Sequence, residues 1–352
     1  MRDVNSLAKE LKGVLGWHQA RVVLLAQFMI ALVKVRSSNL TLIAQVFAGG
    51  AQPSSSYKRL QRFLRGFHLD YEQCAKVLAQ WFCPKEPWVL CLDRTNWDFG
   101  VTKINFLVLA VAHKGIAIPL FWVLLPKKGN SNTAERQALM NRFLVVFGVE
   151  KIAYLTADRE FRGKEWLQYL VDHGVPFCLR IPNNTQVKNK HGNRRLPVSR
   201  LFSLKQGEHM SLNKPRTIWG ISVCLSCATG PKGRVIIASN DEPKKAIHRY
   251  GIRWSIETLF GCLKSRGFDL EKTHLRCHER LEKLFFVLAL TFSWCFMLGI
   301  WQHSLKPIKY KKHGRRSMSL FRYGMDYLHR LLLKSDENIS CFKRSLKVLS
   351  CT

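Results

Sequence analysis

Residues 1–85 place their hydrophobic side chains at the spacing of helices. The segment 22–35 is almost wholly apolar, which predicts a buried helix. Segment 39–50 repeats apolar residues at helical intervals and then reaches Gly49 and Gly50, a common helix stop. The chain is therefore expected to begin with helices.

Segment 53–67 combines an apolar face with a basic face, and the serines at its start can cap a helix. The apolar face consists of Leu60, Phe63, Leu64 and Phe67, and the basic face of Lys58, Arg62 and Arg65. Two short helices around a turn that contains glycine, the second helix basic, resemble a helix-turn-helix that binds DNA. A basic surface helix that enters no DNA groove explains the pattern equally well.

From Pro87 the pattern changes to strands, because apolar β-rich runs alternate with glycine or polar turns. The predicted elements are, in order, three adjacent antiparallel strands at 88–97, 103–114 and 116–127, a helix capped by Thr133, a strand at 151–161, a helix at 164–174 and a strand at 176–181. The order β-β-β-α-β-α-β is that of a ribonuclease-H-like fold, in which a mixed sheet carries helices on its faces.

This pattern is interrupted by a stretch rich in Asn, Lys, Gly and Arg, after which short strand-like pieces follow. The predicted fold class is α/β, with a ribonuclease-H-like core, a β-rich insertion and an N-terminal helical region that binds DNA. The predicted divisions are 1–85 for the helical region, 86–182 for the first part of the core, 183–234 for the insertion, 235–303 for the second part of the core, and 304–352 for a basic C-terminal tail.

The apolar stretch 284–301 carries no charge and is nearly long enough to cross a bilayer. It contains Thr291 and Ser293, stands alone, and lies at the short end of the roughly 17 to 25 residues that a span requires, so a buried helix is expected and a membrane partner is not. Charged residues precede any apolar run at the N-terminus, and the eleven cysteines form no framework. Both features favour a cytoplasmic protein with reduced thiols.

The charge of the chain indicates its partner. Lys and Arg number 56 against 24 Asp and Glu, which gives a net charge of +32. A hydrophobic content of 47% excludes a disordered basic tail and favours a folded protein that handles DNA or RNA. The basic run 306–317 can either contact phosphates or be solvated, and DNA is the favoured interpretation.

Segment 249–268 has polar residues that are unusual for a solvated helix. On one continuous helix of about 100° per residue, Tyr250, Arg253, Glu257 and Lys264 fall within roughly 60° of arc. An apolar stripe on another side of the same helix is typical of docking on a core. The four polar residues form either an ion-paired surface, with Arg253 and Glu257 as an i,i+4 pair, or a site in which the carboxylate binds a metal and the other groups bind phosphate.

Two aspartates bear on this choice, since Asp93 and Asp158 each end an apolar strand. Either one alone could simply cap the turn that follows. If the two strands are neighbours, however, their carboxylates converge at one edge of the sheet, and Glu257 can complete a cluster of three. Such a cluster suits two Mg²⁺ or Mn²⁺ ions for phosphodiester chemistry.

These residues also carry a family resemblance. The spacing of Tyr250, Arg253, Glu257 and Lys264 reproduces the Y-R-E-K signature, and the sequences "LDRTNW" around Asp93 and "TADREFRGKEW" around Asp158 are similar to the two aspartate motifs. The chain thus resembles the cut-and-paste DDE transposases of the insertion-sequence-four family, over roughly residues 1–330.

The resemblance implies that Asp93, Asp158 and Glu257 bind the catalytic metals, and that Arg253, Lys264 and Tyr250 contact phosphates at the transposon end. It implies nicking, a hairpin intermediate and strand transfer on double-stranded DNA with terminal inverted repeats, followed by insertion into target DNA. It also implies a homodimer that joins two ends, in the nucleoid of a bacterium. Trp254, ahead of Trp97 and Trp219, is the predicted stacking partner for a flipped base, although core packing is the more common role of a tryptophan.

Two other interpretations remain open. A catalytically inactive relative of a transposase would bind DNA as a regulator, although the intact Asp93, Asp158 and Glu257 speak against this. Another ribonuclease-H-like nuclease or resolvase would share the metal site, but it leaves the Y-R-E-K stripe unexplained.

Overall fold

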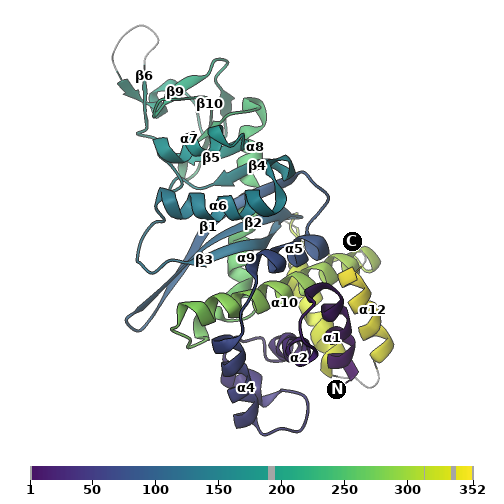
Figure 1. Ribbon diagram of the computed structural model, residues 1–352. Coiled ribbons are helices and arrows are strands. Elements are labelled where there is room, and N and C mark those ends of the chain that lie inside the picture. The colour runs from purple at the N-terminus through teal and green to yellow at the C-terminus, as the bar shows by residue number, and fades with distance from the viewer. Residues whose placement is uncertain (1, 189–194, 313, 334–337, 351–352) are drawn as a thin grey trace. The chain divides into compact units, whose positions relative to one another are not determined.

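A computed structural model of the chain describes residues 2–188, 195–312, 314–333 and 338–350 (Figure 1). The chain divides into two compact units. The helical unit comprises Met1–Cys83, Asn96–Asn105 and Leu259–Thr352, and the sheet unit comprises Pro84–Thr95 and Phe106–Thr258.

The helical unit is built mainly from helices near the two ends of the chain. These are α1 (Arg2–Leu15), α2 (Gln19–Val35), α3 (Leu40–Gln45), α4 (Pro53–Gly66), α5 (Tyr71–Phe82), α10 (His278–Leu305), α11 (Leu320–Leu333) and α12 (Ile339–Ser350). The expected helical character of the first segment is confirmed. Its long apolar run lies in α2, in which Leu25, Phe28 and Leu32 are fully buried.

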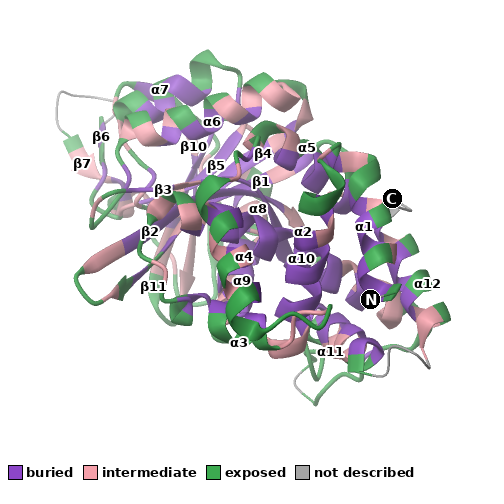
Figure 2. Ribbon diagram, turned by 60° about the horizontal axis from the view of Figure 1, so that its bottom comes forward, coloured by how far each residue is buried: buried purple, intermediate pink, exposed green. Residues whose placement is uncertain are grey.

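The apolar stretch 284–301 lies in α10, and Figure 2 colours most of this helix as buried. In the described part of the chain, α10 is the one helix that is long and apolar enough to cross a membrane, but 83% of its apolar window is buried inside the protein. The predicted core helix is therefore confirmed. Gly299 of α10 and Gly324 of α11 let the two backbones approach closely, since a Cβ on Gly299 would lie 1.8 Å from the carbonyl oxygen of Leu320.

The α4 segment differs in two ways from its prediction. Gln52 is the N-cap and makes no side-chain hydrogen bond, while Pro53 begins the helix, so the predicted serine cap is wrong. Proline has no N–H to satisfy and a φ already suited to the first helical turn, which removes the need for such a cap. Residues 46–52 separate α3 from α4, a longer connection than the three or four residues typical of a helix-turn-helix.

The region after Lys306 is not a solvated tail along its whole length. From Leu320 it folds into α11 and α12, where Met325, Leu328 and Phe342 are buried. The chain beyond the basic run is thus folded, because the apolar faces of α11 and α12 pack within the helical unit. The basic run 306–317 contains a β-bridge between Tyr310 and Arg316, and its His313 lies outside the described residues.

The sheet unit carries the strands and four helices. The strands are β1 (Trp88–Phe99), β2 (Thr102–His113), β3 (Ile116–Leu124), β4 (Ile152–Ala157), β5 (Phe177–Ile181), β6 (Gln186–Lys188), β7 (Arg195–Pro197), β8 (His209–Ser211), β9 (Arg216–Ile218), β10 (Ile221–Gly230) and β11 (Gly233–Ser239). The helices are α6 (Thr133–Phe147), α7 (Lys164–Asp172), α8 (Ala246–Gly251) and the first half of α9 (Trp254–Leu263). The tip of the β1–β2 hairpin belongs to the helical unit.

The described strands form one mixed sheet in the order β3-β2-β1-β4-β5-β11-β10-β9-β6-β7, with β8 paired to β10. Strands β1, β4 and β5 run parallel, and β2 and β3 run antiparallel. The predicted order of three strands, a helix, a strand, a helix and a strand is confirmed by β1 to β5 with α6 and α7 (Figure 1). The chain is thus an α/β protein with a large mixed sheet and many helices.

The segment 183–234 is rich in β-structure, and its strands extend the sheet. Strand β11 pairs antiparallel with both β5 and β10, so it joins the inserted strands to the first five. One predicted detail is wrong: Asn132, rather than Thr133, caps α6. Asn132 and Glu135 form a reciprocal capping box that satisfies two backbone N–H groups, which a cap at Thr133 could not do with this glutamate.

Candidate active site

Two neighbouring strands bring the aspartates together. Asp158 follows the end of β4, but Asp93 lies inside β1, which continues to Phe99 in its hairpin with β2, so the prediction that Asp93 ends a strand is wrong. Strands β1 and β4 are parallel, and Leu92 lies opposite Ala157. Asp93 and Asp158 are the next residues along the two chains, so they lie side by side, Asp93 within β1 and Asp158 directly after β4. The predicted adjacency of the two strands is confirmed.

The segment predicted as one helix from 249 to 268 is instead two helices with a break between them. Helix α8 ends at Gly251 and α9 begins at Trp254. At the break, the N–H of Arg253 donates to the carbonyl of Tyr250 over 3.0 Å and the N–H of Ser255 donates to Ile252 over 2.9 Å. These i to i+3 bonds tighten the turn relative to an α-helix, so the stripe drawn on a continuous helix is wrong across the break.

Arg253 nevertheless meets two of the three predicted carboxylates. Its Nη1 lies 2.9 Å from Oδ2 of Asp93, and its Nη2 lies 2.6 Å from Oε1 of Glu257. The guanidinium is buried, with 8% of the side chain exposed, whereas Glu257 is 38% exposed. The predicted i,i+4 pair of Arg253 and Glu257 is confirmed. The same arginine also pairs with Asp93, which is far away in the sequence.

Asp158 is held by different groups. The hydroxyl of Tyr250 donates to its Oδ1 over 3.1 Å, and Nη1 of Arg180, on β5, lies 3.3 Å from the same oxygen. Three carboxylates therefore face Arg253, Tyr250 and Arg180, which are donors that can also bind phosphate oxygens.

The surroundings separate the ionisation of the two aspartates. Burial raises the pKa of Asp93 to about 7, even though the charge of Arg253 lowers it. Burial also acts to raise the pKa of Asp158, but the hydrogen bond from the backbone of Arg159 and the charges of Arg253 and Arg180 lower it overall. Burial lowers the pKa of Arg253, yet Tyr250 and the carboxylates raise it above the ordinary value, so this guanidinium stays charged.

The donor types at this site fit a hard divalent cation, because Mg²⁺ and Mn²⁺ prefer carboxylate oxygens. Asp93 and Glu257 already face a single positive charge, which is the guanidinium of Arg253. Within the described ranges, however, no three His, Cys, Asp or Glu side chains lie close enough to share a metal ion. A cation held jointly by Asp93 and Glu257 would therefore have to displace Arg253.

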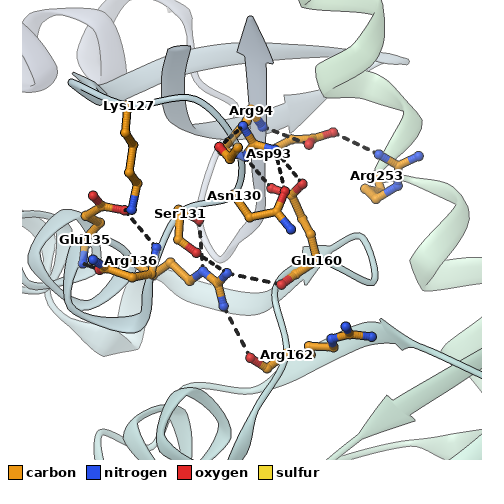
Figure 3. Close-up of polar contacts among 12 residues, drawn as sticks. Asp93, Arg94, Lys127, Asn130, Ser131, Glu135, Arg136, Glu160, Arg162 and Arg253 are labelled. Carbon is orange, nitrogen blue, oxygen red and sulfur yellow. Dashed lines mark hydrogen bonds and ion pairs between the residues drawn. The ribbon is translucent and has the colours of Figure 1, made fainter. Parts of the chain in front are cut away.

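A second set of polar contacts links Arg94 of β1 to Glu160, after β4, and to the loop that precedes α6 (Figure 3). Arg94, next to Asp93, binds Glu160 through two hydrogen bonds of 2.7 and 2.8 Å, from Nε and Nη2. Its Nη1 donates to the carbonyl of Gly129 over 2.7 Å, and Nη2 donates to Oδ1 of Asn130 over 2.9 Å. Because Glu160 follows Asp158 by two residues, this bidentate pair ties β1, beside Asp93, to the turn that carries Asp158.

Arg136 of α6 reinforces the same contacts and is itself buried. Its Nε donates to the hydroxyl of Ser131 over 2.9 Å, and its Nη2 donates to the carbonyl of Glu160 over 3.1 Å. The guanidinium also lies over the ring of Phe161, 5.1 Å from its centroid. The turn after β4 is therefore held by Arg94, which binds the side chain of Glu160, and by Arg136, which binds the carbonyl of Glu160.

Lys264, the fourth member of the predicted stripe, lies in the helical unit, beyond the end of α9. Its Nζ donates to the carbonyl of Asn96 over 3.0 Å, pairs with Glu271 at 2.8 Å, and lies over the ring of Trp97 at 5.4 Å. In this structure Lys264 thus binds protein groups in its own unit.

The tryptophans named as stacking candidates have very different surroundings. Trp254 is 64% exposed next to Arg253, whereas Trp97 is buried. Trp219 lines a hollow of about 420 Å³ together with three basic residues of the sheet unit, namely Lys164, Lys188 and Arg195. Trp166, in α7, is fully buried.

The three predicted cations of α4 do lie together. Lys58, Arg62 and Arg65 line one hollow of about 630 Å³ with Gln61 and with Arg280 of α10. Arg280 was not predicted from the sequence, and neither were Arg94 of β1 and Arg180 of β5. Arg180 had a usable signal, since it is the lone charge in the apolar strand 176–181.

The sequence was also compared with known proteins. A family model described as "Transposase DDE domain" matches residues 84–294, more than half of the chain. The chain belongs to this DDE transposase family. Family membership identifies the protein as an enzyme of transposition and DNA recombination. The matched range of this transposase includes Asp93, Asp158 and Glu257.

No curated protein matches the sequence. Among solved structures, the transposase is similar to a piggyBac transposase in a synaptic complex with hairpin DNA. The two share 11% identity with a TM-score of 0.46, and the match covers 91% of this chain and 72% of that one.

Proposed function

We propose that this DDE transposase cuts and pastes an insertion sequence of the insertion-sequence-four type, and that Asp93, Asp158 and Glu257 are its catalytic residues. The observation that carries the proposal is the bridge from Arg253 to both Asp93 and Glu257, at 2.9 and 2.6 Å. Asp158 directly follows β4, the parallel neighbour of β1. Carboxylates and an arginine that are far apart in the sequence thus meet beside β1 and β4.

The three carboxylates are the proposed ligands for two Mg²⁺ or Mn²⁺ ions. Such ions would activate the attacking water or 3′-hydroxyl and stabilise the leaving oxygen of the phosphodiester. The protein's part is to hold the carboxylates in place, and the bidentate pair of Arg94 and Glu160 supports it by fixing the turn that carries Asp158 to strand β1.

Arg253, Tyr250 and Lys264 are the proposed phosphate-binding groups at the transposon end. Arg253 is charged, buried and already placed between two carboxylates. When DNA binds, its guanidinium moves from the carboxylates to a phosphate, and the carboxylates become free to take metal. This exchange of partners keeps each buried charge paired throughout.

Further parts of the proposal concern DNA. The sheet core is ribonuclease-H-like, the partner is double-stranded DNA with terminal inverted repeats, and the reaction proceeds through a hairpin before insertion into target DNA. Lys58, Arg62 and Arg65 contact DNA from the N-terminal region, and Trp254, exposed beside Arg253, stacks on a flipped base. Two copies join the two ends, in the cytoplasm of a bacterium and at its nucleoid.

The test is cleavage of a labelled duplex that carries the inverted repeats flanking the gene, with Mg²⁺. Wild-type protein should release a 3′-hydroxyl at the repeat end, and Glu257→Ala should keep end binding but lose nicking. Glu165→Ala, which removes an exposed carboxylate of the same unit, is the matched control and should nick normally. Binding without nicking by the wild type, with any divalent metal, would instead indicate a DNA-binding regulator.

A further inference from the structure

The hollow beside α4 gathers four cations from two distant parts of the helical unit. Helix α4 contributes Lys58, Arg62 and Arg65 together with Gln61, and α10 contributes Arg280. The described residues that line this space include no carboxylate. Together these five residues form the α4 hollow.

The packing of α4 keeps these charges together. Leu60, Phe63 and Leu64 are buried on the other side of the helix, so α4 cannot rotate its basic side away without exposing its apolar side. In the described part of the chain, none of the four cations forms an ion pair. Glu279, the acidic neighbour of Arg280, is instead paired with Lys283 at 2.7 Å.

Four like charges fixed around one space repel each other unless an anion lies among them. Three are guanidinium or ammonium groups of one helix, and Arg280 is half-buried on another. A single small anion can use only some of these donors. A chain of phosphates can engage all of them, and guanidinium forks match phosphate oxygens well.

The shape of the site determines which part of DNA it suits. A recognition helix enters the major groove, so its DNA-facing side must project from the protein. The basic side of α4 instead lines a hollow that Arg280 of α10 also lines. A concave basic surface fits the convex ridge of a sugar–phosphate backbone better than the flat edges of bases inside a groove.

We infer that the α4 hollow binds the sugar–phosphate backbone of duplex DNA independently of base sequence, with Arg280 as the fourth phosphate-binding cation. The inference rests on the proposed DNA-binding function and goes further in two respects. It adds Arg280 of α10, which is distant from α4 in the sequence. It also assigns the contact to phosphates rather than to bases. Sequence preference must then come from elsewhere in the protein.

The test is the salt dependence of DNA binding by the full chain, measured by fluorescence anisotropy. Two duplexes of equal length are used, one with the inverted repeat and one unrelated. Arg280→Gln is compared with the wild type and with Arg330→Gln, which removes an exposed arginine of α11 outside the hollow. Lys58→Gln serves as a second variant of the hollow, and circular dichroism checks that each variant is folded.

Arg280→Gln and Lys58→Gln should each weaken binding to both duplexes by the same factor and lower the slope of log K against log salt by about 0.9. Raising salt from about 50 to about 200 mM should then cost each variant about threefold less affinity than it costs the wild type. Arg330→Gln should follow the wild type.

An unchanged slope in folded Arg280→Gln would overturn the inference, and so would a loss confined to the inverted-repeat duplex, which would mean base recognition. Tighter, Arg280-dependent binding of single-stranded DNA would overturn the assignment to a duplex. Failure of this inference is distinct from failure of the proposed function, because nicking at the inverted repeat depends on Glu257 and is measured separately.

Discussion

The ion pair between Arg94 and Glu160 offers a stability measurement that is independent of catalysis. The pair joins strand β1, which carries Asp93, to the turn that carries Asp158, and both side chains are largely buried, with 11% and 21% exposed. Arg94→Met keeps the length of the side chain and removes its charge. Glu160→Gln keeps the shape and the backbone carbonyl that binds Arg136.

The size of the effect follows from the contacts that are lost. Arg94→Met removes two charge-assisted bonds to Glu160 and two bonds to the loop at Gly129 and Asn130. Leaving a mostly buried carboxylate unpaired costs about 3 kcal/mol in the free energy of unfolding. Glu160→Gln should cost about 2 kcal/mol, because an amide oxygen still accepts one of the two bonds.

A double-mutant cycle isolates the pair itself. The double variant should lose about 1 to 2 kcal/mol less than the sum of the single losses, since these residues act on each other. Hydrogen exchange of the amides in β1 and β4 under mild denaturant reports this locally, without a contribution from unfolding of the helical unit. Lys103→Met, which breaks an exposed pair with Asp98, is the control and should cost well under about 1 kcal/mol.

A coupling energy near zero in this cycle would refute the reasoning. It would mean that β1 and the turn after β4 hold their positions without the ion pair. The two hydrogen bonds would then add nothing to the stability that hydrogen bonds to water would not give.

Three other predictions follow from the structure. Because burial raises the pKa of Asp93 to about 7, a proton competes with metal below that pH, so calorimetry should find Mn²⁺ affinity increasing from about pH 6 to about pH 8 in the wild type and not in Asp93→Asn. Arg253→Gln removes the cation that competes for the carboxylates, so Mn²⁺ should bind the DNA-free variant more tightly while nicking falls; unchanged Mn²⁺ affinity would contradict this. Gly299→Ala should destabilise the helical unit by about 3 kcal/mol or more in denaturant unfolding, because its Cβ meets the backbone of Leu320, whereas Gly13→Ala, with open space around it in α1, should be neutral or slightly stabilising.

The adjacency of β1 and β4 could be predicted because its signals are local, although β1 continues past Asp93. Apolar runs that end abruptly in Asp93 and Asp158 combine a strand pattern with a charge that a buried strand does not tolerate without compensation. The order of elements then implied that the two strands are neighbours. Burial of the 284–301 stretch was equally readable, since its length and polar residues favoured a core helix over a membrane span.

The break between α8 and α9 was not predicted, because a helical wheel assumes that the same rotation continues through every residue. The i to i+3 bonds at Arg253 and Ser255 change that rotation. Gly251, at the end of α8, was a signal for a helix end that the wheel ignored. Lys264 consequently does not share a continuous stripe with Tyr250.

Pairs between distant residues were beyond local reasoning altogether. Arg94 and Glu160 lie 66 positions apart, and each one alone resembles an ordinary surface charge. Arg280 likewise lies in the first turn of the core helix α10 and has no nearby partner in sequence that points to α4. Such contacts follow from the register of strands and the packing of helices, which a hydrophobic pattern alone does not specify.

The central claim is that Glu257 acts through a metal ion together with the two aspartates. Its most direct test is nicking of the inverted-repeat duplex by Glu257→Cys, with Mg²⁺ and with Mn²⁺. A thiolate binds Mg²⁺ poorly and accepts the softer Mn²⁺ more readily. The variant should therefore be inactive with Mg²⁺ and recover part of its nicking with Mn²⁺, while Glu257→Ala stays inactive with both. Wild-type nicking by Glu257→Cys in Mg²⁺, or equal recovery of Glu257→Ala in Mn²⁺, would contradict the claim.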